Sequence, residues 1–339
     1  MINTRTPLEQ GSVILNTPSR RIVADRVKAL GGSAIVYEGY EIDRLTGKRS
    51  YKLIKELFPN QEGFYRDKNG KISCDKSIER ECNFFNRMLL LEKDEVNKYN
   101  KLSVDEKGIR NDYFFADSEF IEADNGNFYI LLDTVKGYTL KEIIDLSENG
   151  GSNILCYRSL SEICSYIIAL LNAVQYCHGE KNKLLHLDIA PDNIFIAETV
   201  GTNEFKTRLI DFNSSVLIDG TNHVNLSFKS GYSAPELINA MYSKNSSELG
   251  YSTDLYSVAA VMYRMVFKKC YSSDDIFDFD SFFNELCGSN IVIVENSEYL
   301  DEISQNATAE LHRILEKGLK QDPKKDIYLL KSSEEISAI

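Results

Sequence analysis

The stretch HLDIAPDN, residues 186–193, places an imidazole, two carboxylates and an amide within eight positions. Asp188 follows His186 by two positions, and Asn193 follows Asp188 by five. By themselves these side chains suit an ordinary surface turn. A turn alone does not explain why another carboxylate, Asp211, opens the sequence DFN eighteen positions after Asn193. The residues on both sides of the stretch therefore decide its meaning.

The sequence around this stretch is mainly helical. Residues 160–178 are apolar on all sides, which predicts a helix buried inside a domain. Two short segments, 193–197 and 207–212, interrupt the helical pattern. Helices are then predicted again at 235–243, 253–267 and 309–320.

The first part of the chain is rich in strands. Residues 59–76 are polar and contain Gly and Asn, which predicts a loop or a small insertion. Apolar residues at helical spacing predict one helix over 77–93. Such a β-rich part followed by a helical part implies an α+β chain of two lobes, with domains at 1–135 and 136–339. Runs of β-branched and aromatic residues predict strands at 22–30, 34–42, 49–57, 113–123 and 128–135.

The composition of the chain excludes several classes of protein. The 339 residues carry a net charge of -12 and no basic cluster, which argues against nucleic-acid binding. The seven Cys are scattered, which predicts buried thiols in a reducing compartment rather than a zinc site or a disulfide framework. The best candidate for a membrane span is interrupted by Arg264, and no apolar run approaches the ~18 residues that a span needs. The chain is therefore expected to be cytoplasmic, without a membrane span.

Several motifs resemble, in the same order, those of the eukaryotic-type protein kinase family, including its bacterial Ser/Thr relatives. The resemblance runs from about residue 22 to residue 330, and the ordered set is more specific than any single motif. It implies a bilobal protein-kinase-like fold with a β-rich N-lobe with one main helix and a mainly helical C-lobe. It also implies ATP and Mg²⁺ (or Mn²⁺) as cofactors and a protein as substrate.

The resemblance assigns residues 29–37, ALGGSAIVY, to the glycine-rich loop that covers the ATP phosphates. Gly31 occupies the position of the family's second glycine, whereas alanines occupy those of the first and the third. Small residues let backbone N–H groups approach phosphate oxygens. The expected nucleotide contacts in this loop are Gly31, Gly32, Ser33 and Val36.

Lys55 resembles the Lys that holds the α- and β-phosphates, because it follows two apolar residues as in the family's V-A-I-K. The alternation of side chains along a strand does not by itself exclude Lys52. The partner of Lys55 is expected to be Glu81, which leads a row of apolar residues at helical spacing, with Glu79 as the alternative.

The segment LLDTV, residues 131–135, corresponds to the family's hinge. Leu132 is expected to line the adenine pocket. The backbone groups of Asp133 and Val135 are expected to bind the adenine, so that the identity of these two side chains carries little information.

HLDIAPDN itself resembles the family's catalytic loop, H-R-D-L-K-P-x-N. The resemblance implies that Asp188 accepts or orients the substrate hydroxyl proton and that Asn193 binds a magnesium ion. Asp211, in the sequence that resembles D-F-G, would bridge magnesium to the phosphates. Asn213 replaces the family's Gly, and Asn is among the few residues that tolerate a left-handed backbone.

Two later motifs favour a protein substrate. GYSAPEL, residues 231–237, resembles the A-P-E segment, and Asp254 resembles the buried Asp that anchors the catalytic-loop backbone. Small-molecule kinases of related fold usually lack this pair. The family's Arg that binds the A-P-E Glu is replaced by Asp326, so Glu236 is expected to have another partner.

Two departures bear on activity. Leu187 replaces the Arg that clamps a phosphorylated activation loop, which implies a non-RD kinase that needs no such clamp. Ala190 replaces a Lys beside the γ-phosphate. Lys229 is the candidate substitute, because its long stem could bring an ammonium to that place; the alternative is a solvated Lys. The favoured interpretation is an active Ser/Thr protein kinase. The alternatives are a pseudokinase or nucleotide-binding scaffold, and a kinase-fold enzyme with another transfer such as AMPylation.

Overall fold

The computed structural model divides the chain into two compact units, Met1–Val135 (unit 1) and Lys136–Ile339 (unit 2). The residues that the structure describes are 5–75, 79–104, 113–114, 118–133, 136–151, 153, 155–179, 181–198, 205–218, 226–243, 247–272, 279–289, 291 and 300–319.

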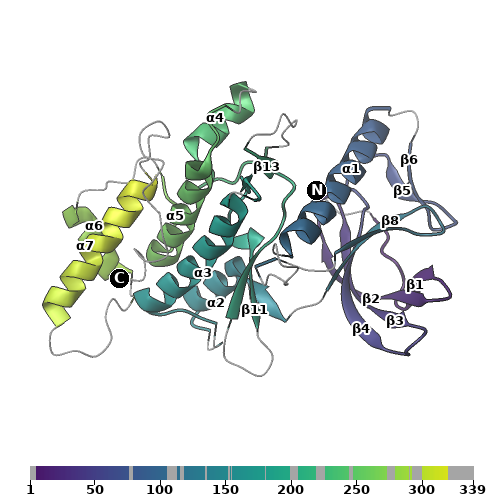
Figure 1. The fold of residues 1–339 in the computed structure, drawn as a ribbon, viewed down its shortest axis with the longest axis horizontal. Coiled ribbons are helices and arrows are strands. Elements are labelled where there is room, and N and C mark those ends of the chain that lie inside the picture. The colour runs from purple at the N-terminus through teal and green to yellow at the C-terminus, as the bar shows by residue number, and fades with distance from the viewer. Residues whose placement is uncertain are drawn as a thin grey trace. The chain divides into compact units, whose positions relative to one another are not determined.

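Unit 1 is built on an antiparallel sheet with the strand order β1-β2-β3-β4-β8-β7 (Figure 1). β-branched and aromatic residues dominate these strands, and they pack well on a pleated surface. Each of the five strands predicted from the sequence has a counterpart in the sheet, and β1 adds an edge strand that was not predicted. The strands are β1 (Ser12–Asn16), β2 (Arg20–Leu30), β3 (Ile35–Asp43), β4 (Arg49–Glu56), β7 (Glu119–Glu122) and β8 (Phe128–Asp133).

The segment 59–76, predicted as a loop or a small insertion, contains a small hairpin of β5 (Phe64–Arg66) and β6 (Ile72–Cys74). The turn between the two strands is held by Asp67, whose carboxylate accepts the backbone N–H groups of Asn69 and Lys71 at 2.8 and 3.0 Å. A short polar side chain of this kind closes a turn without any apolar pattern. The polar composition was therefore correctly recognised, but the strands that flank the turn were missed.

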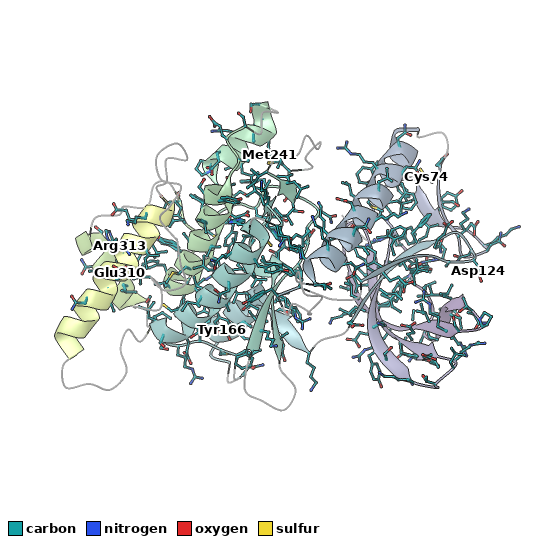
Figure 2. The ribbon with its side chains drawn as sticks, in the orientation of Figure 1. Cys74, Asp124, Tyr166, Met241, Glu310 and Arg313 are labelled. Carbon is teal, nitrogen blue, oxygen red and sulfur yellow. The ribbon has the colours of Figure 1, made fainter. Side chains whose placement is uncertain are left out.

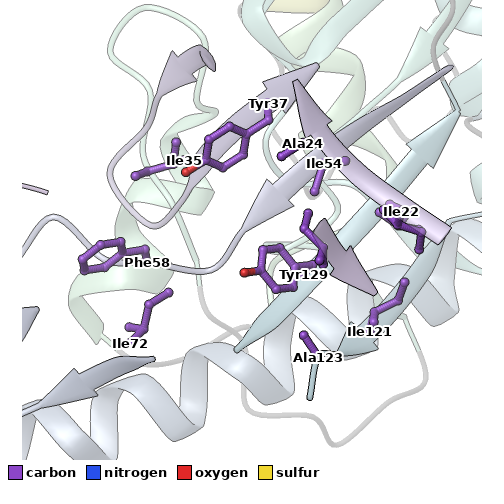
Figure 3. Close-up of a cluster of buried hydrophobic side chains, with 12 residues drawn as sticks. Ile22, Ala24, Ile35, Tyr37, Ile54, Phe58, Ile72, Ile121, Ala123 and Tyr129 are labelled. Carbon is purple, nitrogen blue, oxygen red and sulfur yellow. The ribbon is translucent and has the colours of Figure 1, made fainter. Parts of the chain in front are cut away.

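The two faces of the sheet carry separate cores. Tyr129 and Leu131 of β8 belong to the cluster in Figure 3, together with Ile22, Tyr37 and Ile54. Ile130 points to the opposite face, as the alternation of a strand requires. There the helix α1 (Glu79–Leu102) packs on the sheet. This second cluster consists of Ala34, Leu57, Met88, Val96 and Ile130.

Unit 2 is mainly helical, as predicted, and two of its helices begin at capping boxes. Ser159 starts α3: its side chain accepts the N–H of Glu162, whose carboxylate accepts the N–H of Ser159. Thr139 and Glu142 start α2 in the same way. The helices are α2 (Leu140–Glu148), α3 (Leu160–His178), α4 (Pro235–Ser243), α5 (Tyr251–Phe267), α6 (Phe279–Gly288) and α7 (Leu300–Leu319).

The helix predicted at 309–320 is the second half of α7, which begins at Leu300. Glu310 and Arg313 form an ion pair one turn apart on its surface (Figure 2). α3 is, among the described residues, the one helix that is long and apolar enough to cross a membrane by length and composition. Half of that window is buried inside the protein, and a core helix passes the same test.

Short strands complete unit 2. β9 (Gly137–Thr139), β11 (Ile194–Glu198) and β12 (Phe205–Leu209) form one sheet with β11 in the centre. β10 (Leu184–Leu185) pairs with β13 (Val216–Leu217). The 3-10 turn η1 (Pro191–Asn193) leads into β11, so the stretch 186–193 lies between two strands of known register.

Candidate active site

The register of β11 and β12 brings Asn193 and Asp211 to the same end of one hairpin. Ile194 pairs with Leu209 at the first position of β11. The next pair outward is Asn193 and Ile210, and the N–H of Ile210 donates to the carbonyl of Asn193 at 3.0 Å. Asp211 follows immediately. The seventeen residues between these two side chains are therefore the hairpin that brings them together.

Asn193 holds Asp188 from two sides. Its Nδ2 donates to the carbonyl oxygen and to Oδ2 of Asp188, both at 2.8 Å. The other carboxylate oxygen, Oδ1, is buried and has no hydrogen-bond partner within the described part of the chain. A buried acceptor without a donor costs free energy unless a ligand supplies one. The orientation of Asp188 is thus fixed, and one of its oxygens is left to accept a proton from outside.

Burial raises the pKa of Asp188 above its ordinary value, and Lys229 and His186 counteract this rise by favouring the charged carboxylate. A carboxylate with a raised pKa is a better proton acceptor than an ordinary Asp, because its pKa is closer to the pH at which the protein works. This is the environment that a general base requires.

His186 connects Asp188 to the segment that carries Asp211. Its Nε2 lies 3.1 Å from the carbonyl of Ile210, which can only accept, so Nε2 carries the proton. Nδ1 then accepts the N–H of Asp188, at 3.3 Å. The ring is fully buried against Phe212 with 4.6 Å between centroids. Burial lowers the pKa of His186, which agrees with a neutral ring that donates on one side and accepts on the other.

Asp254 anchors the backbone of the catalytic stretch, as predicted. It is fully buried on α5 and accepts the N–H groups of His186 and Leu187, both at 2.8 Å. His178, the last residue of α3, completes the set with Nε2 at 2.8 Å from Oδ2. Burial opposes ionisation of Asp254, but the contacts with the two His residues and the backbone outweigh it, and the pKa of Asp254 is lowered.

The two replaced positions of the stretch are both buried. Leu187 is 1% exposed and has a φ of 60°, a left-handed conformation that is rare for such a residue. Its amide is one of the two held by Asp254, and this contact helps to keep the strained backbone in place. Ala190 is also 1% exposed. No cation stands at either position.

Lys229 lies beside two carboxylates of the stretch 186–193. Its Nζ lies 2.7 Å from Oδ1 of Asp192 and 3.6 Å from Oδ2 of Asp188. The backbone around it is turned tightly, because the N–H groups of Tyr232 and Ser233 both donate to the carbonyl of Lys229. Of the two alternatives left open by the sequence, these distances agree better with an ammonium near Asp188 than with a fully solvated side chain.

Glu236 has another partner, as expected from the Asp326 that stands in place of the family's Arg. The hydroxyl of Thr253, on α5, donates to Oε1 of Glu236 at 2.9 Å. Burial raises the pKa of Glu236, and this hydrogen bond works against the rise. Asp326 itself lies outside the described residues.

In unit 1 the partner of Lys55 among the described residues is Glu92, whereas Glu81 was predicted. Nζ of Lys55 lies 2.6 Å from Oε2 of Glu92, which is nearly fully buried, and 4.0 Å from Oε2 of Glu95. Glu81, whose side chain lies outside the described residues, precedes Glu92 by eleven positions on α1. At 1.5 Å per residue this is about 16 Å along the helix, too far for one ammonium to serve both carboxylates.

Glu92→Gln is expected to lower the free energy of unfolding by about 1–3 kcal/mol, because it removes the charge that pairs with a largely buried ammonium. Glu81→Gln is expected to change it by less than about 0.5 kcal/mol, as for a surface substitution. Urea titration of both variants and the wild type measures the difference. If Glu81→Gln lowered the free energy of unfolding more than Glu92→Gln does, Glu81 would be the partner of Lys55, as predicted from the sequence.

The other residues predicted to bind nucleotide in unit 1 are distributed as follows. Gly31 closes the predicted glycine-rich turn, donating its N–H to the carbonyl of Ala34 at 2.9 Å. Gly32 and Ser33 form the tip of this turn. Val36 pairs with Lys55 across β3 and β4, and Leu132 pairs with Leu53 across β4 and β8.

Lys52, the rejected candidate, is engaged elsewhere. Its Nζ pairs with Asp133 at 2.5 Å and with Glu41 at 3.8 Å. The choice of Lys55 over Lys52 therefore agrees with the contacts of both residues. Asp133 offers its carboxylate to Lys52, so that only its backbone remains for the predicted hinge role. Val135, the other predicted hinge residue, lies outside the described residues.

The donor set in unit 2 fits a magnesium ion bound together with phosphates. Asn193 and Asp211 supply hard oxygen ligands at one end of the hairpin, which is the chemistry that Mg²⁺ prefers. Within the described residues no group of three His, Cys, Asp or Glu gathers closely enough to hold a metal by itself. Mg²⁺ is commonly bound by one or two carboxylates plus substrate phosphates, so the pair suits a metal that arrives with a nucleotide.

Sequence reasoning missed three residues at these sites. Asp192, beside Lys229, was passed over because an Asp in a polar turn has no distinctive pattern. Glu92 lies four positions after the buried Met88, and this helical spacing was the signal that was available for it. Glu56 is completely buried and accepts two bonds from Arg66, at 2.9 and 2.7 Å; the only signal was a carboxylate next to Lys55.

Comparison with known proteins agrees with this geometry. The model of the protein kinase domain matches residues 67–329. The α′ subunit of casein kinase II from Saccharomyces cerevisiae is 34% identical over 111 residues, which cover 32% of this chain and 30% of that protein. A probable serine/threonine-protein kinase of Clostridium perfringens is 32% identical over 141 residues, which cover 41% of this chain and 18% of that protein. The matched segments thus span less than a third of either relative.

A solved structure, described as "PpkA-294 apo form", shares the fold: the TM-score is 0.62, with 19% identity, over 98% of both chains. This likeness supports the bilobal α+β architecture predicted from the sequence. The match to the family model begins after the glycine-rich turn and Lys55, so the assignment of those residues rests on the sequence motifs and on the structure of unit 1. Since the kinase model covers well over half of the chain, the protein belongs to the protein kinase family.

Proposed function

We propose that the protein transfers the γ-phosphoryl group of ATP to Ser or Thr hydroxyls of a protein substrate. The observation that carries this proposal is the arrangement around Asp188: one oxygen held by Asn193 and Lys229, the other buried without a donor. A pseudokinase gains nothing from a proton acceptor prepared in this way.

Each side chain has a task in the proposed reaction. Oδ1 of Asp188 accepts the proton of the attacking hydroxyl, while Asn193 keeps the carboxylate in a single orientation. Lys229 places a positive charge beside the carboxylate, where negative charge moves from nucleotide to acceptor. Bound magnesium, held by Asn193 and Asp211, would neutralise phosphate charge. Positioning and charge neutralisation of this kind supply most of the catalysis in phosphoryl transfer.

Buried Leu187 supports a non-RD kinase. An apolar side chain that is 1% exposed offers no charge to a phosphorylated activation segment, so activity does not require that modification. The Glu236–Thr253 contact and the Asp254 anchor support a protein substrate, because these motifs distinguish protein kinases in the family resemblance. Cys164 and Cys177 are buried thiols outside any disulfide, which supports a reducing, cytoplasmic compartment.

The proposal is tested by incubating the protein with magnesium and a general Ser/Thr protein substrate in the presence of either γ-labelled or α-labelled ATP. Label transfer from γ-labelled ATP alone is the expected result. Transfer from α-labelled ATP would indicate AMPylation instead. Nucleotide binding without any transfer would indicate a pseudokinase and would overturn the proposal.

Lys229→Met is expected to cut turnover by about 10–100-fold and to leave ATP affinity nearly unchanged, because one preorganised charge near the transferred group is lost. Since Lys229 lowers the pKa of Asp188, its removal raises that pKa further. Asp188 acts as the charged base, so the acid limb of the pH–rate profile is expected to move to higher pH. Steady-state kinetics over a pH series measures both effects.

Ala190→Lys in the Lys229→Met background provides the reciprocal control. A Lys at position 190 returns the charge from the other side of the site, so part of the turnover should return. Lys206→Met, on β12 of the same unit, serves as the control for loss of a Lys elsewhere. Near-wild-type turnover in Lys229→Met would show that the ammonium plays no part in the reaction.

A further inference from the structure

The first described residues form a strap over the glycine-rich turn of unit 1. We call residues 5–8 the N-terminal strap. Arg5 is 8% exposed, and its guanidinium donates to the carbonyl of Gly31 at 2.5 Å and to the carbonyl of Phe58. One arginine thus joins the turn to the segment that follows β4. The strap lies well before residue 67, where the match to the kinase family begins.

Two further contacts hold the strap in place. The N–H of Leu8 donates to the hydroxyl of Tyr37 at 2.9 Å, and Nε of Arg66 donates to the carbonyl of Thr6 at 3.1 Å. Both partners also bind the carboxylate of Glu56: the Tyr37 hydroxyl at 2.8 Å and the Arg66 guanidinium at 2.7 Å. The strap is therefore attached to a completely buried acid that adjoins Lys55 in β4.

The strap holds one of the two backbone carbonyls of the glycine-rich turn. The carbonyl of Gly31 is held by Arg5, and the carbonyl of Gly32 accepts the N–H of Asn60 at 2.7 Å. In a trans peptide the C=O and the following N–H point in opposite directions, and the described chain has no cis peptide. The N–H groups of Gly32 and Ser33 are thus turned away from Arg5 and Asn60.

These two N–H groups donate to no acceptor within the described residues. Consecutive unpaired amides make an anion-binding nest. A Cβ at Gly32 would meet no atom within 4 Å, so the tip of the turn is open. Both carbonyls of the turn are therefore engaged, whereas the two amides at its open tip are left for a ligand.

We propose that Arg5 is a positioning residue for the nucleotide: it fixes the Gly31 carbonyl so that the amides of Gly32 and Ser33 face the phosphates before ATP arrives. This inference rests on the proposed ATP binding. Arg5 would act by preorganisation: a turn that is already ordered loses less conformational freedom when the ligand binds. The effect is expected to be specific to phosphate, since adenosine carries no anionic group for the amides.

The test compares Arg5→Met and Arg5→Lys with Arg26→Met, a matched control. Arg26 lies on β2 and pairs with Glu38, but its side chain is 72% exposed. Affinities for ATP and for adenosine are measured by calorimetry, and thermal unfolding is followed in parallel. Arg5→Met is expected to weaken ATP binding about tenfold, the effect of one lost charge-assisted hydrogen bond, with adenosine binding unchanged. Arg5→Lys keeps the positive charge but loses the planar guanidinium that reaches two carbonyls, so an intermediate loss of ATP affinity is expected.

The outcomes separate this inference from the proposed function. Wild-type protein that fails to bind ATP overturns both. Wild-type binding together with unchanged ATP affinity in Arg5→Met and Arg5→Lys overturns the role of Arg5 alone. An equal loss of ATP and adenosine affinity would mean that Arg5 serves only the fold of unit 1. If Arg5→Met does not fold, Arg5→Lys decides the question by the ratio of its ATP and adenosine affinities.

Discussion

Asp188→Ala is expected to lower the rate of phosphoryl transfer by about 10²–10⁴-fold, the range for a positioned acid–base group. The reason is Oδ1, which is buried and has no hydrogen-bond partner within the described residues. ATP binding should be retained, because the backbone of the stretch is held by Asp254 and not by the side chain of Asp188. Single-turnover kinetics with labelled ATP separates the chemical step from binding.

Asp188→Asn and Asp145→Asn complete the experiment. Asp188→Asn keeps the shape of the side chain but cannot take a proton, and it should be as slow as the Ala variant to within about tenfold. Asp145 is an exposed carboxylate on α2, and its replacement should leave the rate unchanged. If Asp188→Asn transfers phosphate at the wild-type rate, the carboxylate is not the base.

The residues of unit 2 that form the candidate site were predictable because local register joins them. Asn193 and Asp211 flank one hairpin, and Lys229 comes from a segment whose order along the chain matches the family's motifs. The reach of Lys229 was left open by the sequence, since a Lys stem can extend into solvent equally well. Only the positions of Asp188 and Asp192 favour one alternative.

The partner of Lys55 could not be predicted in the same way. Apolar spacing identifies the face of α1 that packs on the sheet, but the pattern repeats every three or four residues. It does not say which turn of the helix lies beside Lys55. That position depends on contacts such as those of Met88 and Val96 with the sheet, which involve residues far apart in the sequence.

The Glu56 network was hidden for a related reason. Its donors Tyr37, Arg66 and Tyr129 come from three different strands. The sequence of β4 alone shows a charged residue at the end of a strand, which predicts exposure. A completely buried carboxylate is tolerated here because each of its oxygens accepts hydrogen bonds from outside β4. Donors that come from other strands leave no pattern in the sequence of β4.

Asp254→Ala is expected to lower the free energy of unfolding by about 3–5 kcal/mol, as for loss of one partner of a buried charged network. It leaves the buried N–H groups of His186 and Leu187 without an acceptor, at a place where Leu187 holds a left-handed backbone. Because the pKa of Asp254 is lowered from 3.8 on folding, its contribution is complete above about 3.8 and is lost as the pH falls through the lower folded value.

Urea unfolding of unit 2 at pH 7 and at pH 3 tests both statements, with Arg264→Met as the control on the same helix. Arg264 pairs with Glu148, and both side chains are only partly exposed, so its replacement should cost less than that of Asp254, about 1–2 kcal/mol. Asp254→Asn keeps one acceptor oxygen but brings an NH₂ group toward a backbone N–H, so it should also destabilise the protein. If Asp254→Asn retains both wild-type stability and activity, the catalytic stretch keeps its shape without a buried charge, and the left-handed Leu187 must be held by its side-chain packing alone.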